Sequence, residues 1–259
     1  MHEDKSKNHL MNLKGRVAWV TGGARGIGRA IALALARAGA DVAVVDINAA
    51  DAASVADEVR NEGVRALVLS CDVSDSAQVE HMAEDVIRGL GRLDIAVNNA
   101  GVLLGHTAAE CADDVWRQVM GVNLDGVYWC CRAAGRKLIE RGEGGRIINI
   151  ASMSAQVADW PRRHCAYSVS KAGVVMMTRY LAVEWGEHGI TVNSISPGNT
   201  ETEMLSEQDE HRKRWIESTP LRRLAKPEEI GSAAVYLASG AAAYVSGHDL
   251  VIDGAYVCS

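Results

Sequence analysis

The chain has 259 residues, of which 48% are hydrophobic and 23% charged, and it contains no Phe. This length fits one large α/β domain or two smaller ones, with a core built from Leu, Ile, Val, Ala and Met. A formal net charge of -6, with scattered Lys and Arg, argues against nucleic-acid binding. No segment approaches the ~20 consecutive apolar residues of a membrane helix. The composition therefore favours a partner that is a small molecule.

The N-terminal residues and the cysteines show no sign of export. Residues 1–12 are polar and charged and lack the apolar run of a secretory signal, so residues 1–13 are expected to form a flexible tail. The six cysteines have no Cys-x-x-Cys spacing, and no paired histidines stand at zinc-site intervals. We therefore expect reduced thiols in the cytoplasm, with neither a disulfide framework nor a metal site.

The predicted elements begin with a strand, a Gly-rich loop, a helix and a second strand. Residues 17–20 are a short apolar run, and an Ala-rich helical stretch at residues 30–38 ends at Gly39. Residues 42–46 show little polar alternation, as expected for a parallel strand covered on both faces.

Further strand candidates alternate with helical segments along the rest of the chain. They cover residues 66–69, 95–97, 146–150, 191–195 and 250–252. This alternation predicts right-handed crossovers and a doubly wound parallel sheet flanked by helices, the Rossmann fold. No linker marks a second domain, so residues 14–259 are expected to form a single domain.

A charged segment at residues 203–220 interrupts the alternation after Pro197-Gly198 and carries Trp215 near its end. We expect it to form a lid over the substrate. The alternative is a solvated connection, because charged helices commonly face water.

The Gly-rich loop, Thr21 to Gly28, predicts a phosphate-binding site. Its glycines allow backbone to approach a pyrophosphate, and the following helix N-terminus offers N–H groups and a favourable dipole. Asp46 ends the second strand, 18 positions after Gly28. A carboxylate there accepts hydrogen bonds from ribose hydroxyls and repels the 2′-phosphate of NADP, which favours NAD. Arg25 argues in the opposite direction, since its guanidinium suits a 2′-phosphate.

Tyr167 and Lys171 form a candidate proton-transfer pair. Residues four apart on a helix are neighbours, and an ammonium beside a phenol lowers the phenol's pKa from its usual value of about 10. Such a tyrosine can serve as a base near neutral pH. By itself this spacing also arises often by chance on a surface helix.

Several separated motifs together resemble the short-chain dehydrogenase/reductase family, from about Gly15 to Tyr256. They are the Thr-Gly-x-x-x-Gly-x-Gly of residues 21–28, the Asn-Asn-Ala-Gly of residues 98–101, Tyr167 with Lys171, and Pro197-Gly198 followed by Thr202. The resemblance implies a Rossmann fold and hydride transfer between a nicotinamide cofactor and a secondary alcohol or ketone.

The resemblance also implies individual roles around the reaction. Tyr167 would be the general acid/base, Lys171 its pKa-lowering partner and ribose anchor, and Asn123 a proton-relay residue. Alignment from the preceding strand gives Ser152 as the serine that orients the substrate, and we prefer it. The family's usual spacing of 13 residues before the tyrosine gives Ser154 instead.

The residues expected to bind the cofactor are spread over the same motifs. They are Gly22, Arg25, Gly26, Ile27, Gly28, Asp46, Ile47, Asp72, Val73, Asn99, Ala100, Gly101, Tyr167, Lys171, Pro197, Gly198, Thr200 and Thr202. Asp72 has an alternative role as a helix N-cap, because Asp is common where a strand leads into a helix.

The substrate is expected to be a polyol or sugar, because the variable segments resemble those of sugar-alcohol dehydrogenases and offer mixed polar and aromatic groups. Candidate substrate residues are Ser154, Trp160, His164 and Met204. The alternatives are an NADPH-dependent reductase of 3-oxoacyl or other carbonyl substrates, and an NAD(H)-responsive regulatory or scaffold protein. The resemblance further implies a homotetramer, with the helices that contain Asn123 and Tyr167 at the interfaces.

Overall fold

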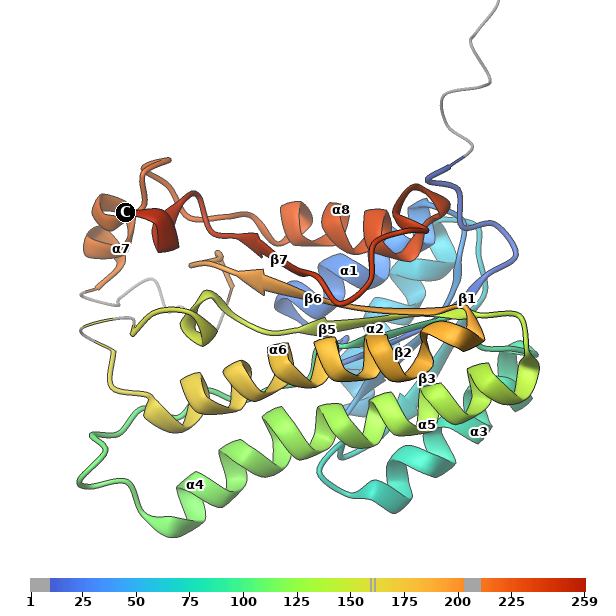
Figure 1. The fold of residues 1–259 in the computed structure, drawn as a ribbon. Helices are drawn as coiled ribbons and strands as arrows, with labels where there is room; N and C mark the ends of the chain where they lie inside the picture. Colours follow the sequence, from blue (N-terminus) through green and yellow to red (C-terminus); the bar gives the residue numbers. More distant parts are fainter. Residues whose placement is uncertain (1–9, 159, 161, 203–210) are drawn as a thin grey trace, which may run out of the picture.

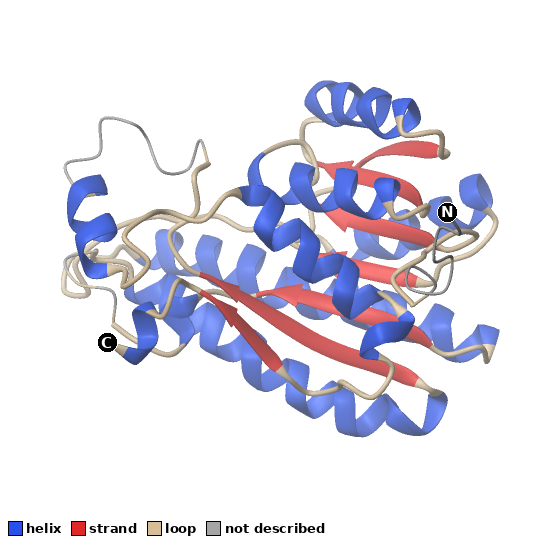
Figure 2. Cartoon of the chain, turned by 90° about the horizontal axis from the view of Figure 1, so that it is seen from above, coloured by secondary structure: helices blue, strands red, loops and turns tan. Residues whose placement is uncertain are grey.

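A computed structural model describes residues 10–158, 160, 162–202 and 211–259, and within them seven parallel strands form one sheet. The spatial order is β3-β2-β1-β4-β5-β6-β7 (Figure 1). The strands are β1 (Val17–Thr21), β2 (Asp41–Asp46), β3 (Ala66–Ser70), β4 (Ile95–Asn98), β5 (Gly145–Ile150), β6 (Ile190–Pro197) and β7 (Asp249–Ile252). Figure 2 shows them side by side across the molecule. The prediction of a doubly wound parallel sheet is confirmed, and each predicted strand differs from the observed one by at most two residues at either end.

Helices cover both faces of this sheet. One face carries α1 (Gly26–Arg37), α2 (Ala49–Asn61) and α8 (Pro227–Ala238), and the other carries α3 (Ser76–Leu90), α5 (Gly126–Arg141) and α6 (Cys165–Trp185). Two shorter helices, α4 (Asp113–Met120) and α7 (Arg212–Ser218), complete the order. No helix among the described residues is long and apolar enough to cross a membrane.

The inner strands β1, β2 and β4 are mostly apolar because both of their faces are buried. In β1, Val17 and Trp19 pack toward α3, α5 and α6, whereas Ala18 and Val20 pack toward α1, α2 and α8. Alternate residues of a strand point to opposite faces, so a strand between two helical layers needs apolar side chains throughout. This explains the continuous apolar runs in the sequence.

The order of strands reverses between β1 and β4, where Val20 pairs with Val97. The chain from β1 moves outward to β2 and β3, then returns to the other side of β1. In open α/β sheets this switch point leaves a crevice beyond the carboxyl ends of the strands, which is where ligands bind.

A buried polar network connects the sheet to α6. Trp19 Nε1 donates to Asn98 Oδ1 at 3.1 Å, Asn98 Nδ2 donates to Asn149 Oδ1 at 2.9 Å, and Asn149 Nδ2 donates to Thr178 Oγ1 at 2.9 Å. Each hydrogen bond satisfies a group that would otherwise be costly to bury. The network fixes α6, and with it the Tyr167 and Lys171 pair, relative to β1, β4 and β5.

One sequence expectation changes at the N-terminal end of the chain. Leu13 was assigned to the flexible tail, but its side chain is only 2% exposed in the core and its N–H donates to the Ala38 carbonyl at 2.8 Å. Met11 packs against the same core, and the polar residues around the two had concealed these apolar contacts. Residues 1–9 of the expected tail, and residues 203–210 of the expected lid, lie outside the described residues.

The described part of the expected lid is α7. Its Trp215 is buried, and in Figure 1 the helix lies on the side of the molecule toward which β6 and β7 point. A lid over the crevice remains a proposal, which this location favours.

Candidate active site

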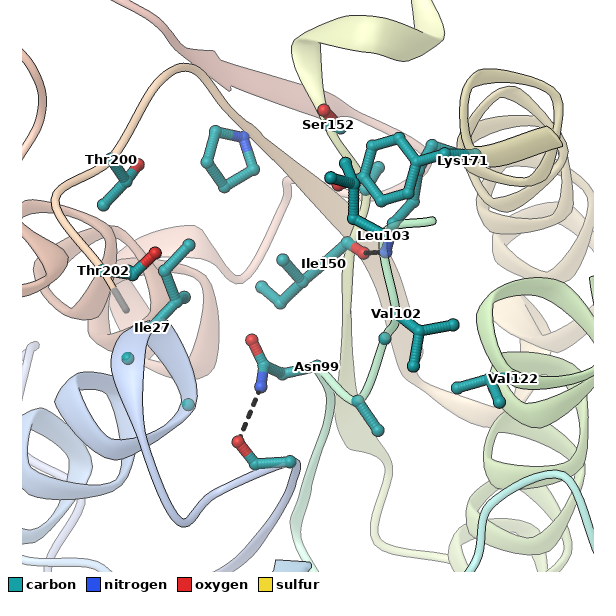
Figure 3. A pocket seen from close by; sticks show the side chains of 18 of the residues that line it. Ile27, Asn99, Val102, Leu103, Val122, Ile150, Ser152, Lys171, Thr200 and Thr202 are labelled. Atoms are coloured by element: carbon teal, nitrogen blue, oxygen red, sulfur yellow. Dashed lines mark hydrogen bonds between the residues drawn. The ribbon is translucent and has the colours of Figure 1, made fainter. Parts of the chain in front are cut away.

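A cleft of about 710 Å³ opens beyond the carboxyl ends of the strands. Every residue predicted to bind the cofactor lines it, together with Ser152 and Ser154. Figure 3 shows Thr200 and Thr202 on one side of this cleft and Ser152 and Lys171 on the other. Motifs separated by up to 180 residues of sequence therefore share one cavity (residue 22 to residue 202).

The Gly-rich loop fits a pyrophosphate because it leaves backbone exposed where side chains would intrude. Gly22 and Gly26 have φ of +61° and +52°, and a Cβ on Gly28 would lie 2.0 Å from the Gly22 carbonyl oxygen. No side chain caps the N-terminus of α1, and its first turn contains no acidic residue. The N–H groups and dipole of this helix end remain available to an anion.

Asn99 and Thr21 hold the loop against β4. Asn99 Nδ2 donates to the carbonyl oxygens of Thr21 and Gly22, both at 3.0 Å (Figure 3). Thr21 Oγ1 accepts from the N–H groups of Asn99 and Ala100 at 3.0 and 3.2 Å. The side chain of Asn99 thus positions the loop that lines the cleft.

Asp46 is connected to the same loop from the end of β2. Its Oδ2 accepts from Ala24 N at 3.1 Å, and its Oδ1 accepts from Asn48 N at 3.1 Å. The carboxylate is therefore held in a fixed orientation at the edge of the cleft. Nearby Arg25 also lines the cleft, so both groups considered for cofactor selection are present.

Asp72 lines the cleft and is not the N-cap of α3. Asp75 is that cap, with its side chain accepting from Ala77 N and Gln78 N. Asp72 instead closes a turn by accepting from the N–H and hydroxyl of Ser74, at 2.9 and 2.7 Å. Its alternative role as a helix cap is therefore wrong.

Lys171 is a buried ammonium beside Tyr167. Its side chain is 3% exposed, its Nζ donates to the Ile150 carbonyl at 2.7 Å, and Nζ lies 5.7 Å from the centre of the Tyr167 ring (Figure 3). Burial lowers the pKa of Lys171 from 10.5 to about 8, because desolvation penalises the charged form. The pair has the proximity that its sequence spacing predicts.

Asn123 lies behind the cleft, in a π-helical turn, Gly121–Asp125, that joins α4 to α5. Its Oδ1 accepts from Val102 N at 2.8 Å, and its Nδ2 donates to Val102 O at 2.9 Å and to Ser170 Oγ at 3.3 Å. A Cβ on Gly101 would lie 3.3 Å from Asn123 Oδ1 and 3.5 Å from Lys171 Nζ. Asn123 and Lys171 therefore flank Gly101, and π turns are frequent at functional sites.

Ser152 and Ser154 are both buried and both line the cleft. Ser152 follows β5 closely, and its Oγ accepts from Ser154 N at 3.2 Å to cap the short 3-10 helix Met153–Ala155. Ser154 lies within that helix. The strand end thus fixes Ser152 directly, whereas the position of Ser154 depends on Ser152.

Two of the remaining substrate candidates, Trp160 and His164, do not line the cleft. The side chain of Trp160 is 63% exposed, and Met204 lies outside the described residues. His164 is buried, and its ring meets that of Tyr167 edge-on with centres 5.5 Å apart. It therefore contacts the tyrosine and is absent from the cleft lining.

Sequence reasoning missed other residues that line the cleft. They include Val102, Leu103, Gln118, Val122 and Asn199. Arg162, which belongs to the variable segment expected to determine the substrate, also lines it, and its guanidinium lies 3.9 Å from the centre of the Trp215 ring. Asn199 directly follows Pro197-Gly198, which was the available signal for its position.

Comparison with known proteins supports one family. The sequence model described as enoyl-(acyl carrier protein) reductase matches residues 22–256. Galactitol 2-dehydrogenase of Rhizobium johnstonii is 42% identical over 257 residues, covering 98% of this chain and 99% of that protein. D-threitol dehydrogenase of Mycolicibacterium smegmatis is 43% identical over 259 residues, covering 98% and 97%.

Solved structures have the same fold and hold nicotinamide cofactors of both kinds. A short-chain type dehydrogenase/reductase from Mycobacterium marinum has a TM-score of 0.94 at 39% identity, covering 96% of this chain and 98% of that one. A gluconate 5-dehydrogenase from Burkholderia cenocepacia in complex with NADP and tartrate has 0.92 at 35%, covering 97% and 99%. A 7α-hydroxysteroid dehydrogenase complexed with NADH has 0.90 at 32%, covering 98% and 97%. The chain belongs to the short-chain dehydrogenase/reductase family of nicotinamide-dependent oxidoreductases.

Proposed function

We propose that this protein interconverts a secondary alcohol and a ketone on a polyol or sugar, with NAD(H) as cofactor and Tyr167 as general acid/base. The observation that carries the proposal is the buried ammonium of Lys171 beside Tyr167, in the cleft lined by the Gly-rich loop. The names of the galactitol and D-threitol dehydrogenases support the substrate class.

The residues of the chain account for proton transfer. When bound, the nicotinamide exchanges a hydride with the carbon that bears the hydroxyl. Tyr167, as phenolate, takes the proton of the substrate hydroxyl during oxidation and returns it during reduction. The ammonium of Lys171 stabilises the phenolate, and Asn123 and Lys171 offer a polar route behind Gly101 along which the proton leaves. Ser152, the preferred serine, orients the reacting oxygen.

A polyhydroxylated substrate suits the polar groups of the cleft. Beyond the expected cofactor residues, its lining includes Ser152, Ser154, Gln118 and Arg162. A long acyl chain or a steroid would leave many of these groups without hydrogen bonds. The cation of Arg162 favours including sugar acids among the substrates tested.

NAD(H) is the proposed cofactor because Asp46 presents a fixed carboxylate at the end of β2. Its hydrogen bonds from Ala24 N and Asn48 N keep it in place beside the loop. A 2′-phosphate at this position would meet a negative charge that cannot easily turn away, whereas ribose hydroxyls can donate to it.

We also propose a homotetramer in which α6 forms part of an interface. The described part of this helix exposes the apolar side chains of Val169, Met176, Tyr180 and Val183. Such a row is costly in water and commonly marks a contact between subunits. Light scattering should give a mass four times that of the 27.7 kDa chain, and a monomer mass would contradict the proposal.

A substrate panel tests the reaction. Polyols, ketoses, sugar acids and β-ketoacyl thioesters should be assayed with both cofactors at two pH values, and we expect turnover of polyols with NAD. Tyr167→Phe should lower kcat/KM by roughly 10²–10⁴-fold and leave the Kd for NADH unchanged. Tyr244→Phe, at a fully exposed tyrosine that precedes β7, should change neither value.

Three outcomes of the panel would overturn the proposal. Turnover of acyl thioesters alone would establish the acyl reductase. NADH binding without turnover on any substrate would favour a regulatory or scaffold protein. Full activity of Tyr167→Phe would remove Tyr167 as the acid/base.

Removing the charge of Asp46 should shift cofactor preference. Asp46→Asn keeps an acceptor for Ala24 N but removes the repulsion of a 2′-phosphate. The ratio of kcat/KM with NADPH to that with NADH should rise by about tenfold or more, which corresponds to about 1.4 kcal/mol. Asp57→Asn, at an exposed acid on α2, is the control. An equal loss with both cofactors would mean that Asp46 only supports the loop.

The stability of the cofactor-free protein should depend on pH through Lys171. Its pKa is about 8 when folded, against 10.5 as the ordinary value, so in this window the unfolded chain binds the extra proton. The free energy of unfolding, relative to that of Lys171→Met, should therefore rise by about 1 kcal/mol per pH unit between these values.

Urea unfolding at pH 8 and pH 10 measures this difference. Lys213→Met, at an exposed lysine of α7, should parallel the wild type at both pH values. A wild-type advantage over Lys171→Met that stays constant with pH would show that the lysine titrates normally.

A further inference from the structure

His164 places a buried imidazole against the tyrosine that is proposed as acid/base. The residue is 5% exposed, and its ring meets that of Tyr167 edge-on, with ring centres 5.5 Å apart and ring planes 89° apart. His164 is absent from the lining of the cleft, and its side chain does not cap α6. Neither substrate contact nor helix capping therefore explains why this ring is buried here.

The spacing of residues along α6 explains the contact. Tyr167 is the third residue of this helix, and a long side chain on a helix lies over the turn that precedes it. For Tyr167, that position is occupied by His164, three residues earlier. Lys171 lies four residues later and brings its Nζ to 5.7 Å from the ring centre. The phenol ring is thus next to His164 in one direction along the helix and next to Lys171 in the other.

Backbone contacts fix both aromatic residues. His164 forms a parallel bridge with His106, and its carbonyl oxygen accepts from Ser168 N at 3.1 Å. The carbonyl oxygen of Tyr167 accepts from Ser170 Oγ at 2.7 Å. With the two backbones held, the motion left to Tyr167 is rotation of its side chain. The imidazole restricts that rotation, because it fills the space beside the phenol ring.

We propose that His164 is a positioning residue that holds the phenol of Tyr167 in the orientation required for proton transfer. This assignment rests on the proposed function. A general base has to lie within about 2.6–3.2 Å of the atom whose proton it takes, and a displacement of about 1 Å can cost about 100-fold in rate. Because the contact is made by the shape of the ring, a flat apolar ring should replace the imidazole.

Two variants separate the ring from its polar atoms. His164→Ala removes the ring, whereas His164→Phe keeps a flat ring that has no hydrogen-bonding or titrating atom. The control is His188→Ala, at a histidine whose side chain is 40% exposed in the 3-10 helix Gly186–His188 that follows α6. For each protein, kcat and KM are measured over a pH series with the best polyol of the substrate panel, together with the Kd for NADH and the Tm.

His164→Ala should lower kcat by roughly 10- to 100-fold and leave KM and the Kd for NADH unchanged. The pH at which oxidation reaches half of its maximal kcat/KM should move upward, because a loosened phenol is stabilised less well as phenolate by the ammonium of Lys171. His164→Phe should restore most of kcat and the wild-type pH profile. His188→Ala should match the wild type throughout. If His164→Phe does not fold, free imidazole added to His164→Ala replaces it and should restore kcat.

Other results overturn the assignment in distinguishable ways. Wild-type kcat and pH profile in His164→Ala would mean that the imidazole does not position the phenol. A kcat that neither the phenylalanine nor added imidazole restores would assign the effect to the polar atoms of the histidine. A parallel loss of Tm, NADH binding and kcat would make His164 structural only.

Failure of the proposed function has a different signature. A wild type that turns over no polyol, or a fully active Tyr167→Phe, would overturn the proposed function and this assignment with it. An active wild type with an inactive Tyr167→Phe and an unaffected His164→Ala would overturn the assignment alone.

Discussion

The site depends on the ammonium of Lys171, a charge that is held in the protein interior. Lys171 Nζ is nearly removed from water and donates a hydrogen bond to the Ile150 carbonyl at the end of β5. Keeping an ammonium there lowers its pKa and costs stability. The arrangement persists because the Asn98, Asn149 and Thr178 network fixes α6 against the sheet. The position of the cation is thus set by the packing of α6 on β5, and the phenol beside it takes its chemistry from that position.

In the cofactor half of the cleft, a few hydrogen bonds fix the Gly-rich loop and Asp46 relative to each other. The reversal of strand order brings the ends of β1 and β4 together, and Asn99 and Thr21 use that proximity to fix the Gly-rich loop. Asp46 then bonds to Ala24 within the loop. The Asp46 carboxylate, which would meet the ribose, is therefore hydrogen-bonded to the loop whose backbone would meet the phosphates. A change in either is expected to shift the position of the other.

Sequence reasoning succeeded where the signal was local. The Gly-rich loop, the apolar strands and the Tyr167 and Lys171 spacing each follow from the geometry of a single element. It failed where distant segments decide the outcome. The anchoring of Leu13 depends on Ala38, which belongs to another part of the chain. The helix cap at Asp75 is a separate, local case, because Asp72 is the same residue type and closes the preceding turn instead. The location of Asn123 behind Gly101 and the buried, unbonded amide of Asn199 became visible only when the strands were side by side.

The two walls of the cleft then have different physical requirements. On the wall formed by β5 and α6, proton transfer needs a fixed phenol, a buried cation and satisfied neighbours, so almost any substitution disturbs several hydrogen bonds at once. On the wall formed by residues 197–202, the side chain of Asn199 bonds to nothing in the described structure, so a substitution there perturbs no internal partner. A substitution of Asn199 can therefore leave in place the hydrogen bonds that Lys171 and Ser152 make on the other wall.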